Sequence, residues 1–88
     1  MEKFAKNTLV KFVGKAAYKD YHSDYQKIWG MVGLIRDVGV EFRSPSTGEM
    51  ICTYDVHFEV PYYDTEHKTE RHRYTILSNE IVWVSQGA

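Results

Sequence analysis

The side chains with the widest chemical scope in this 88-residue chain are a single cysteine and four histidines. They are Cys52, His22, His57, His67 and His72. A metal site needs several such ligands at short spacings, and the stretch from His67 to His72 lacks a tight ligand motif. His57 and His72 also fall on opposite parities of their predicted strands, so their rings should not converge. We therefore expect no metal site and no cofactor.

A second group of titratable side chains surrounds His57. Asp55 and Glu59 lie two residues away on either side, so all three share one face if the segment is a strand. Such a trio could act as a general acid–base cluster. On an exposed strand it is more often part of an ion-pair ladder, and we expect Glu59 to lie opposite Arg71 or Arg73.

Nothing else in the sequence suggests catalysis. Cys52 falls on the inward face of its segment with no histidine beside it to activate the thiol, so it should be a small buried hydrophobic residue. The glycines of the stretch from Gly30 to Gly33 fall inside a predicted strand and do not precede a helix, so they do not form a phosphate-binding loop. We expect that the protein is not an enzyme.

The sequence supports a binding function better than a catalytic one, because basic and aromatic residues gather in the first third of the chain. The candidate residues there are Lys15, Tyr18, Lys19, Tyr21, Tyr25, Lys27 and Trp29. Lysines can neutralise phosphates while tyrosine rings stack on unpaired bases, as in single-strand binding. The same rings suit a protein interface. A third interpretation is that two tyrosines pack the loop onto the domain while the lysines are solvated.

A second aromatic pair, Tyr62 and Tyr63, comes just before a predicted turn. Pro61 and the polar run 64–68 should form that turn, ending the preceding strand at residue 60. Neighbouring residues point to opposite sides, so one of the two tyrosines should be exposed. Because acidic residues follow, this pair suits a basic protein partner better than nucleic acid.

Composition and charge narrow the function classes further. The apolar fraction is 43% and the aromatic fraction 15%, enough for one small core but not for a second domain. The net charge of −1 is unlike that of an avid nucleic-acid binder. This net charge is the sum of +3 over residues 1–30 and −4 over residues 31–88. We find neither a secretory signal nor a membrane-spanning apolar run, and expect a cytoplasmic protein.

Alternation of apolar and polar residues predicts an all-β domain. Even-numbered residues from 50 to 60 are apolar and most odd-numbered ones are polar, which indicates a strand with one buried face. Residues 38–42 share this parity, and turn residues 44–48 between the two runs predict a hairpin with even-numbered residues inward. The other predicted strands are residues 8–13, 28–35, 70–77 and 81–84, with a tight connector at 78–80. Tyr54, Phe58, Tyr74 and Trp83 should enter the core.

The order of these features resembles the SH3-like small barrels, including KOW-type modules and the peripheral subunit IV of photosystem I. The residues that carry the resemblance are Leu9 to Phe12, Gly30 to Ile35, Tyr54 to Phe58, and Thr75 to Ile81. It implies a five-stranded SH3-like barrel with a long loop after the first strand and a short 3-10 turn before the last. A single domain would span residues 1–88, with its core at about 8–85 and short flexible termini.

These observations favour a non-enzymatic module that binds another protein, such as a small regulator or inhibitor of a larger partner. An exposed edge strand could also recruit a partner by adding a strand to the sheet. The alternative is a module that binds single-stranded or duplex nucleic acid through the Lys/Tyr loop. No small-molecule substrate and no membrane partner is evident from the residues.

Overall fold

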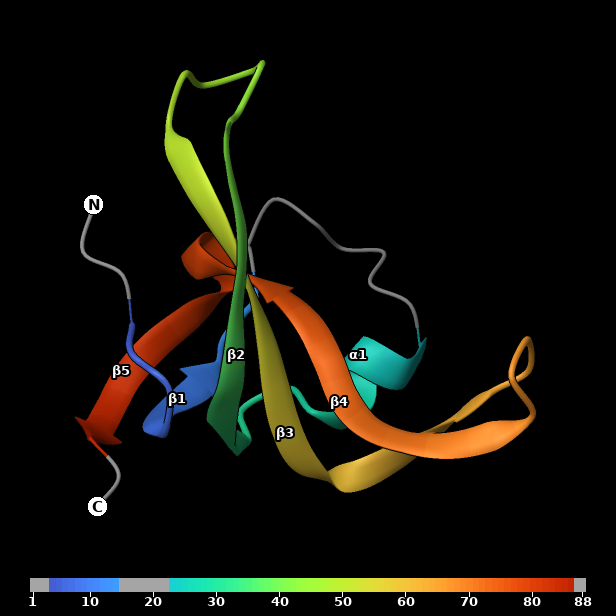
Figure 1. Ribbon diagram of the computed structural model, residues 1–88. Helices are drawn as coiled ribbons and strands as arrows, with labels where there is room; N and C mark the ends of the chain where they lie inside the picture. Colours follow the sequence, from blue (N-terminus) through green and yellow to red (C-terminus); the bar gives the residue numbers. More distant parts are fainter. Residues whose placement is uncertain (1–3, 15–22, 87–88) are drawn as a thin grey trace.

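The computed structural model describes residues 4–14 and 23–86 of the chain. Its elements are, in order, β1 (Thr8–Phe12), α1 (Ser23–Lys27), β2 (Val32–Arg43), β3 (Met50–Asp64), β4 (Thr69–Leu77), the 3-10 turn η1 (Ser78–Glu80) and β5 (Ile81–Gln86). The strands form one antiparallel sheet in the order β4-β3-β2-β1-β5 (Figure 1). β4 and β5 are therefore the two edge strands.

This architecture confirms the all-β prediction, together with the long first connection, the hairpin around residues 44–48 and the 3-10 turn before the last strand. Two details differ from the sequence-based expectation. The first connection contains the short helix α1. Residues 28–30 then form a turn, so β2 begins at Val32, four residues later than predicted, and runs without interruption to Arg43.

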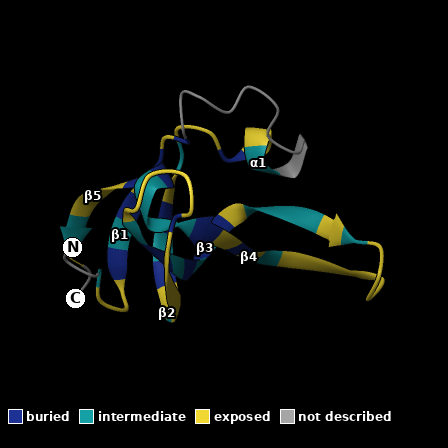
Figure 2. Cartoon of the chain, turned by 90° about the horizontal axis from the view of Figure 1, so that it is seen from above, coloured by how far each residue is buried: buried dark blue, intermediate teal, exposed yellow. Residues whose placement is uncertain are grey.

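The core lies where the inner faces of the strands meet. β3 supplies its centre, and buried stretches of this strand are visible in Figure 2. Cys52, Tyr54, Val56 and Phe58 of β3 have no exposed surface. The core is completed by Val10, Phe12, Ile28, Ile35, Tyr74, Ile76 and Ile81. Three of the four predicted core aromatics, Tyr54, Phe58 and Tyr74, are thus buried. Full burial of such a side chain contributes on the order of 2–3 kcal/mol, so these rings dominate the stability of a small domain.

The predicted inward parity is wrong for the far half of β2. Val40 is 70% exposed and Phe42 is also exposed, although both are even-numbered. The pairing of β2 with β3 shifts at residues 35–37 and again at 38–41. Each irregularity interrupts the strict alternation of faces. This half of the hairpin also projects from the rest of the sheet as an arm (Figure 1).

β3 bends between His57 and Tyr62. Within this stretch, the four residues 58–61 face a single residue of β4, which makes a large β-bulge. Pro61 lies in the bulge, where its missing N–H removes no ladder hydrogen bond. The strand therefore continues to Asp64, and the prediction that it would end before Pro61 is wrong.

Side chains of β4 replace the backbone hydrogen bonds that the bulge removes. Tyr74 donates its hydroxyl proton to the carbonyl oxygen of Val60, at 2.7 Å. The Nδ1 atom of His72 lies 3.0 Å from the carbonyl oxygen of Phe58. Since an unpaired buried carbonyl costs about 1–3 kcal/mol, these two bonds keep the bend compatible with a packed core.

Gly33 in β2 shows how closely the strands pack. A Cβ atom there would lie 2.7 Å from side-chain atoms of Phe58 and Val56 and 2.9 Å from the carbonyl oxygen of His57. Only glycine fits without displacing the backbone of β3. Gly30 meets no such obstacle, and its positive φ of 79° serves the turn before β2.

We predict that Gly33→Ala lowers the free energy of unfolding by about 1–3 kcal/mol, because the added methyl group overpacks the core against a fixed carbonyl. Urea denaturation followed by circular dichroism measures the change. Val40→Thr, an exposed β-branched exchange on the same strand, should stay within about 0.5 kcal/mol of the original chain. Equal stabilities of the two variants would contradict the close contact at Gly33.

Candidate binding surface

Four of the predicted binding residues fall outside the part of the chain that the structure describes: Lys15, Tyr18, Lys19 and Tyr21. The other five lie on or just after α1 and on the far part of β3: Tyr25, Lys27, Trp29, Tyr62 and Tyr63. The structure brings two of these together, since the rings of Tyr25 and Tyr62 both contact Tyr74. Lys27 is exposed at the end of α1.

Tyr25 and Tyr62 are tied into the fold. The Tyr25 hydroxyl donates to the carbonyl oxygen of Thr75 at 3.0 Å, and the Tyr62 hydroxyl donates to that of Arg73 at 3.1 Å. The ring of Tyr62 also packs on Tyr74 at a centroid distance of 4.8 Å. Both side chains therefore stabilise the edge strand β4, and only part of each remains for a partner.

Trp29 and Tyr63 present more of their surface. Trp29 meets Phe12 edge-on at a centroid distance of 5.5 Å and lies over Gly14, yet much of its ring is exposed. Tyr63 is 58% exposed, which confirms that one member of the Tyr62–Tyr63 pair faces solvent. Among the predicted binding residues that the structure describes, Trp29 and Tyr63 are the aromatic residues that are exposed.

We predict that Tyr25→Phe lowers the free energy of unfolding by about 0.5–1.5 kcal/mol, because it removes the hydroxyl that binds the Thr75 carbonyl. Tyr63→Phe makes the same chemical change at an exposed ring and should shift stability by less than about 0.5 kcal/mol. Urea titrations of both variants provide the comparison. A larger loss for Tyr63→Phe than for Tyr25→Phe would be inconsistent with the roles described above.

The expectation that His57 and His72 would not converge is wrong. Their rings stack with centroids 5.3 Å apart and planes 16° apart. The bulge at residues 58–61 is the reason, because it breaks the strict alternation on which the expectation rested.

The predicted pairing of Glu59 with an arginine of β4 is also wrong. Glu59 lies in the bulge, and its Oε1 atom is 3.1 Å from Nε2 of His57 on the same strand. Arg71 instead contacts Asp64, with Nε 2.7 Å from Oδ2. Both pairs are solvent-accessible, so each contributes at most about 1 kcal/mol. These side chains fasten the β3–β4 arm through ion pairs.

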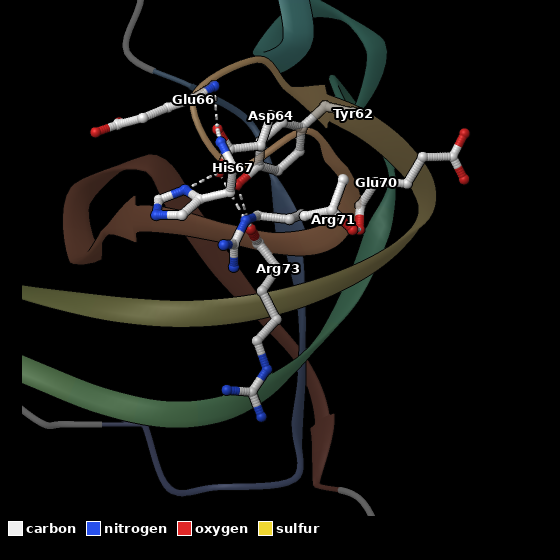
Figure 3. A network of polar contacts seen from close by, with 8 residues as sticks. Tyr62, Asp64, Glu66, His67, Glu70, Arg71 and Arg73 are labelled. Atoms are coloured by element: carbon white, nitrogen blue, oxygen red, sulfur yellow. Dashed lines mark hydrogen bonds and ion pairs between the residues drawn. The ribbon is translucent and has the colours of Figure 1, made fainter.

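Asp64 is the hub of the turn that joins β3 to β4 (Figure 3). Its Oδ1 accepts the backbone N–H groups of Glu66 and His67 at 3.0 and 3.2 Å. Its Oδ2 lies 2.8 Å from Nδ1 of His67 and 2.7 Å from Nε of Arg71. Hydrogen bonds from the His67 side chain and backbone, reinforced by Arg71, lower the pKa of Asp64 from 3.8 to about 2.

Among the described residues, the ligand atoms of Asp64, Glu66 and His67 come within 4.8 Å of one another, as a metal site would require. The guanidinium of Arg71 already neutralises the Asp64 carboxylate, however, and would repel a cation at that oxygen. The same carboxylate also closes the turn through two backbone N–H groups. We therefore assign these residues a structural role at the tip of the arm.

We predict that the stability difference between the original chain and Asp64→Asn depends on pH. The folded-state pKa lies below the unfolded value, so the contribution of Asp64 is fully present above pH 4 and disappears as the pH falls towards 2. Thermal unfolding at several pH values between 2 and 7 measures this difference. Glu66→Gln, which keeps both bonds to Asp64 Oδ1, serves as the control. A difference that stays constant down to pH 2 would refute the role of Asp64.

The largest departure from the sequence-based expectation concerns Trp83. It was expected in the core, but it is 60% exposed, and its neighbours Val82 and Val84 are 46% and 39% exposed. Trp83 pairs with the buried Val10 of β1, so its side of the strand is the core side. Because β5 is an edge strand, the core layer ends there and leaves the ring uncovered.

The opposite face of the sheet is also apolar at this edge. Val32 of β2, Lys11 of β1 and Val82 of β5 lie in one row across three strands. All three are exposed. We call the residues Val32, Lys11, Val82, Trp83 and Val84 the β5 edge surface.

Glu80 fixes the position of this surface. Its Oε1 accepts the N–H of Leu77 at 2.8 Å, and its carbonyl oxygen accepts the N–H groups of Val13 and Gly14 at 2.9 and 3.0 Å. The residue is almost fully buried. The ends of β1 and β4 and the start of β5 are thereby held together, which places β5 beside β1.

Sequence reasoning missed this surface for a definite reason. Residues 81–84 are apolar at both parities, so their pattern does not tell which face is buried. Only the place of the strand in the sheet decides that question. The absence of charge over residues 81–86 is the one signal in the sequence that distinguishes this strand from β4.

The fold and its exposed apolar edge define a small all-β domain. Comparison with protein-family models, with curated proteins and with solved structures finds no match to this chain. Among the described residues, no helix is long and apolar enough to span a bilayer.

Proposed function

We propose that this protein is a non-enzymatic binding module that acts through protein–protein interaction, with the β5 edge surface as its contact site. The observation that carries the proposal is the exposure of three consecutive apolar residues, Val82, Trp83 and Val84, on a strand with a single neighbour. Tryptophan is among the residues most enriched in interface hot spots.

The backbone of β5 suits strand addition. The Glu80 carbonyl bonds to the end of β1, so the peptide groups of Glu80 face β1. By the alternation of an antiparallel ladder, those of Ile81 and Trp83 face away from it. An extended segment of a partner would find backbone donors and acceptors there, with the Trp83 ring on one face of the sheet and Val82 on the other.

The other edge of the sheet is less suited to this role. β4 carries Glu70, Arg71 and Arg73, and charges on an edge strand oppose the addition of another strand. The carbonyl oxygens of Arg73 and Thr75 already accept hydrogen bonds from tyrosine hydroxyls. A partner that adds a strand is therefore expected at β5.

A protein partner fits this surface better than nucleic acid. Lys11 is the one charged residue of the β5 edge surface, whereas phosphate binding depends on several cations. We also propose an SH3-like barrel for the fold. The order of the elements and the long bend of β3, shared between the centre of the sheet and an arm, support that assignment.

We predict that Trp83→Lys reduces capture of protein partners from the source-cell lysate about tenfold or more, since it places a charge in the centre of an apolar contact. Val40→Lys introduces the same charge at a site that is 70% exposed on the other arm and should leave capture unchanged. Quantitative mass spectrometry of the captured proteins measures both. Equal capture by both variants would contradict the proposal. Loss of capture as salt rises from about 50 to 500 mM would also contradict it and would favour nucleic acid.

A further inference from the structure

We propose that the β5 edge surface pairs with a second copy of this chain, joining two sheets through antiparallel β5 strands about a twofold axis. This inference rests on the proposed function, because it names the partner of the same surface. Val82, Trp83 and Val84 form a palindrome around Trp83. In an antiparallel pair about a twofold axis at Trp83, each residue before the axis lies opposite one after it, so this palindrome places a valine opposite each valine.

The pairing follows from the sequence numbers. With the axis at Trp83, Val82 lies opposite Val84 of the partner subunit, and the regular pairing ends there because the register shift between Trp83 and Ser85 interrupts the ladder. The two Trp83 residues face each other. Because the peptide groups of Trp83 face away from β1, the central pair can exchange both of its backbone hydrogen bonds. Apolar side chains would then meet apolar side chains on both faces of the joined sheet.

Charge permits this contact with a second copy. β5 contains no charged residue from Ile81 to Gln86, and the whole chain carries a net charge of only −1. Self-repulsion between copies is therefore weak. Lys11 lies on β1, so β5 separates it from the twofold axis. In the dimer both β5 strands would lie between the two Lys11 side chains, which therefore do not face each other.

The contrast with the rest of the sheet strengthens the choice of β5. Natural edge strands are usually protected from pairing by charges, prolines or bulges. β4 carries three charged residues from Glu70 to Arg73, whereas Ile81–Gln86 contains neither a charge nor a proline. Its one irregularity, a register shift opposite Leu9 and Val10, leaves Val84 as the extra residue at the end of the proposed contact.

Sedimentation velocity tests the proposal over protein concentrations from about 10 μM to about 1 mM. We expect the mass to rise from one chain to two. Trp83→Lys should raise the dissociation constant about tenfold or more, since two lysines would then face each other on the axis. Trp83→Phe should retain the dimer, and Val40→Lys should behave like the original chain. A dimer that survives Trp83→Lys, or that Val40→Lys dissolves, overturns the proposal.

Amide hydrogen exchange locates the contact. The N–H of Trp83 should become protected as the protein concentration rises, in step with the dimer fraction. Protection that is independent of concentration would mean that the chain covers its own edge, and it would overturn the proposal. A chain that remains monomeric at about 1 mM also overturns self-pairing. The binding function has a separate readout, because capture of a different protein can still depend on Trp83 in a monomeric module.

Discussion

The bend of β3 is the constraint on which the rest of the structure depends. Four residues of β3 face one residue of β4, and the carbonyl groups released by this mismatch are bonded by Tyr74 and His72. The same Tyr74 ring holds Tyr25 and Tyr62. Without the bend, β3 and β4 would form a straight ribbon with too little curvature to enclose a core. With it, a chain of this length buries its aromatic rings and still projects an arm.

The two edges of the sheet have different chemical character. β4 is charged, and two of its carbonyl groups bind tyrosine hydroxyls, whereas β5 is uncharged and exposes Trp83. Glu80 holds β5 firmly in place through bonds to the ends of β1 and β4. The β5 edge surface is for these reasons the centre of both proposals.

Several elements were predictable because their signals are local. The alternation along β3 identified its buried face, and turn residues 44–48 identified the hairpin that precedes it. Predictions failed where register mattered. Pro61 was expected to end a strand, but the bulge around it accommodates the missing donor. His57 and His72 were expected to stay apart, but the same bulge lets their rings stack. A bulge depends on the partner strand, and sequence periodicity on one strand does not reveal it.

The sequence by itself determined the class of the domain, most of its core and the absence of any motif typical of catalysis. These follow from residue type and short-range spacing, since a side chain's hydrophobicity and the period of a strand are local properties. Tertiary structure alone decided which aromatic residues are available to a partner. Tyr25 and Tyr62 are anchored by carbonyl groups of β4, and Trp83 is exposed although its own strand is apolar throughout. Exposure at that position depends on whether another strand follows in the sheet, and the order of strands is a property of the whole fold.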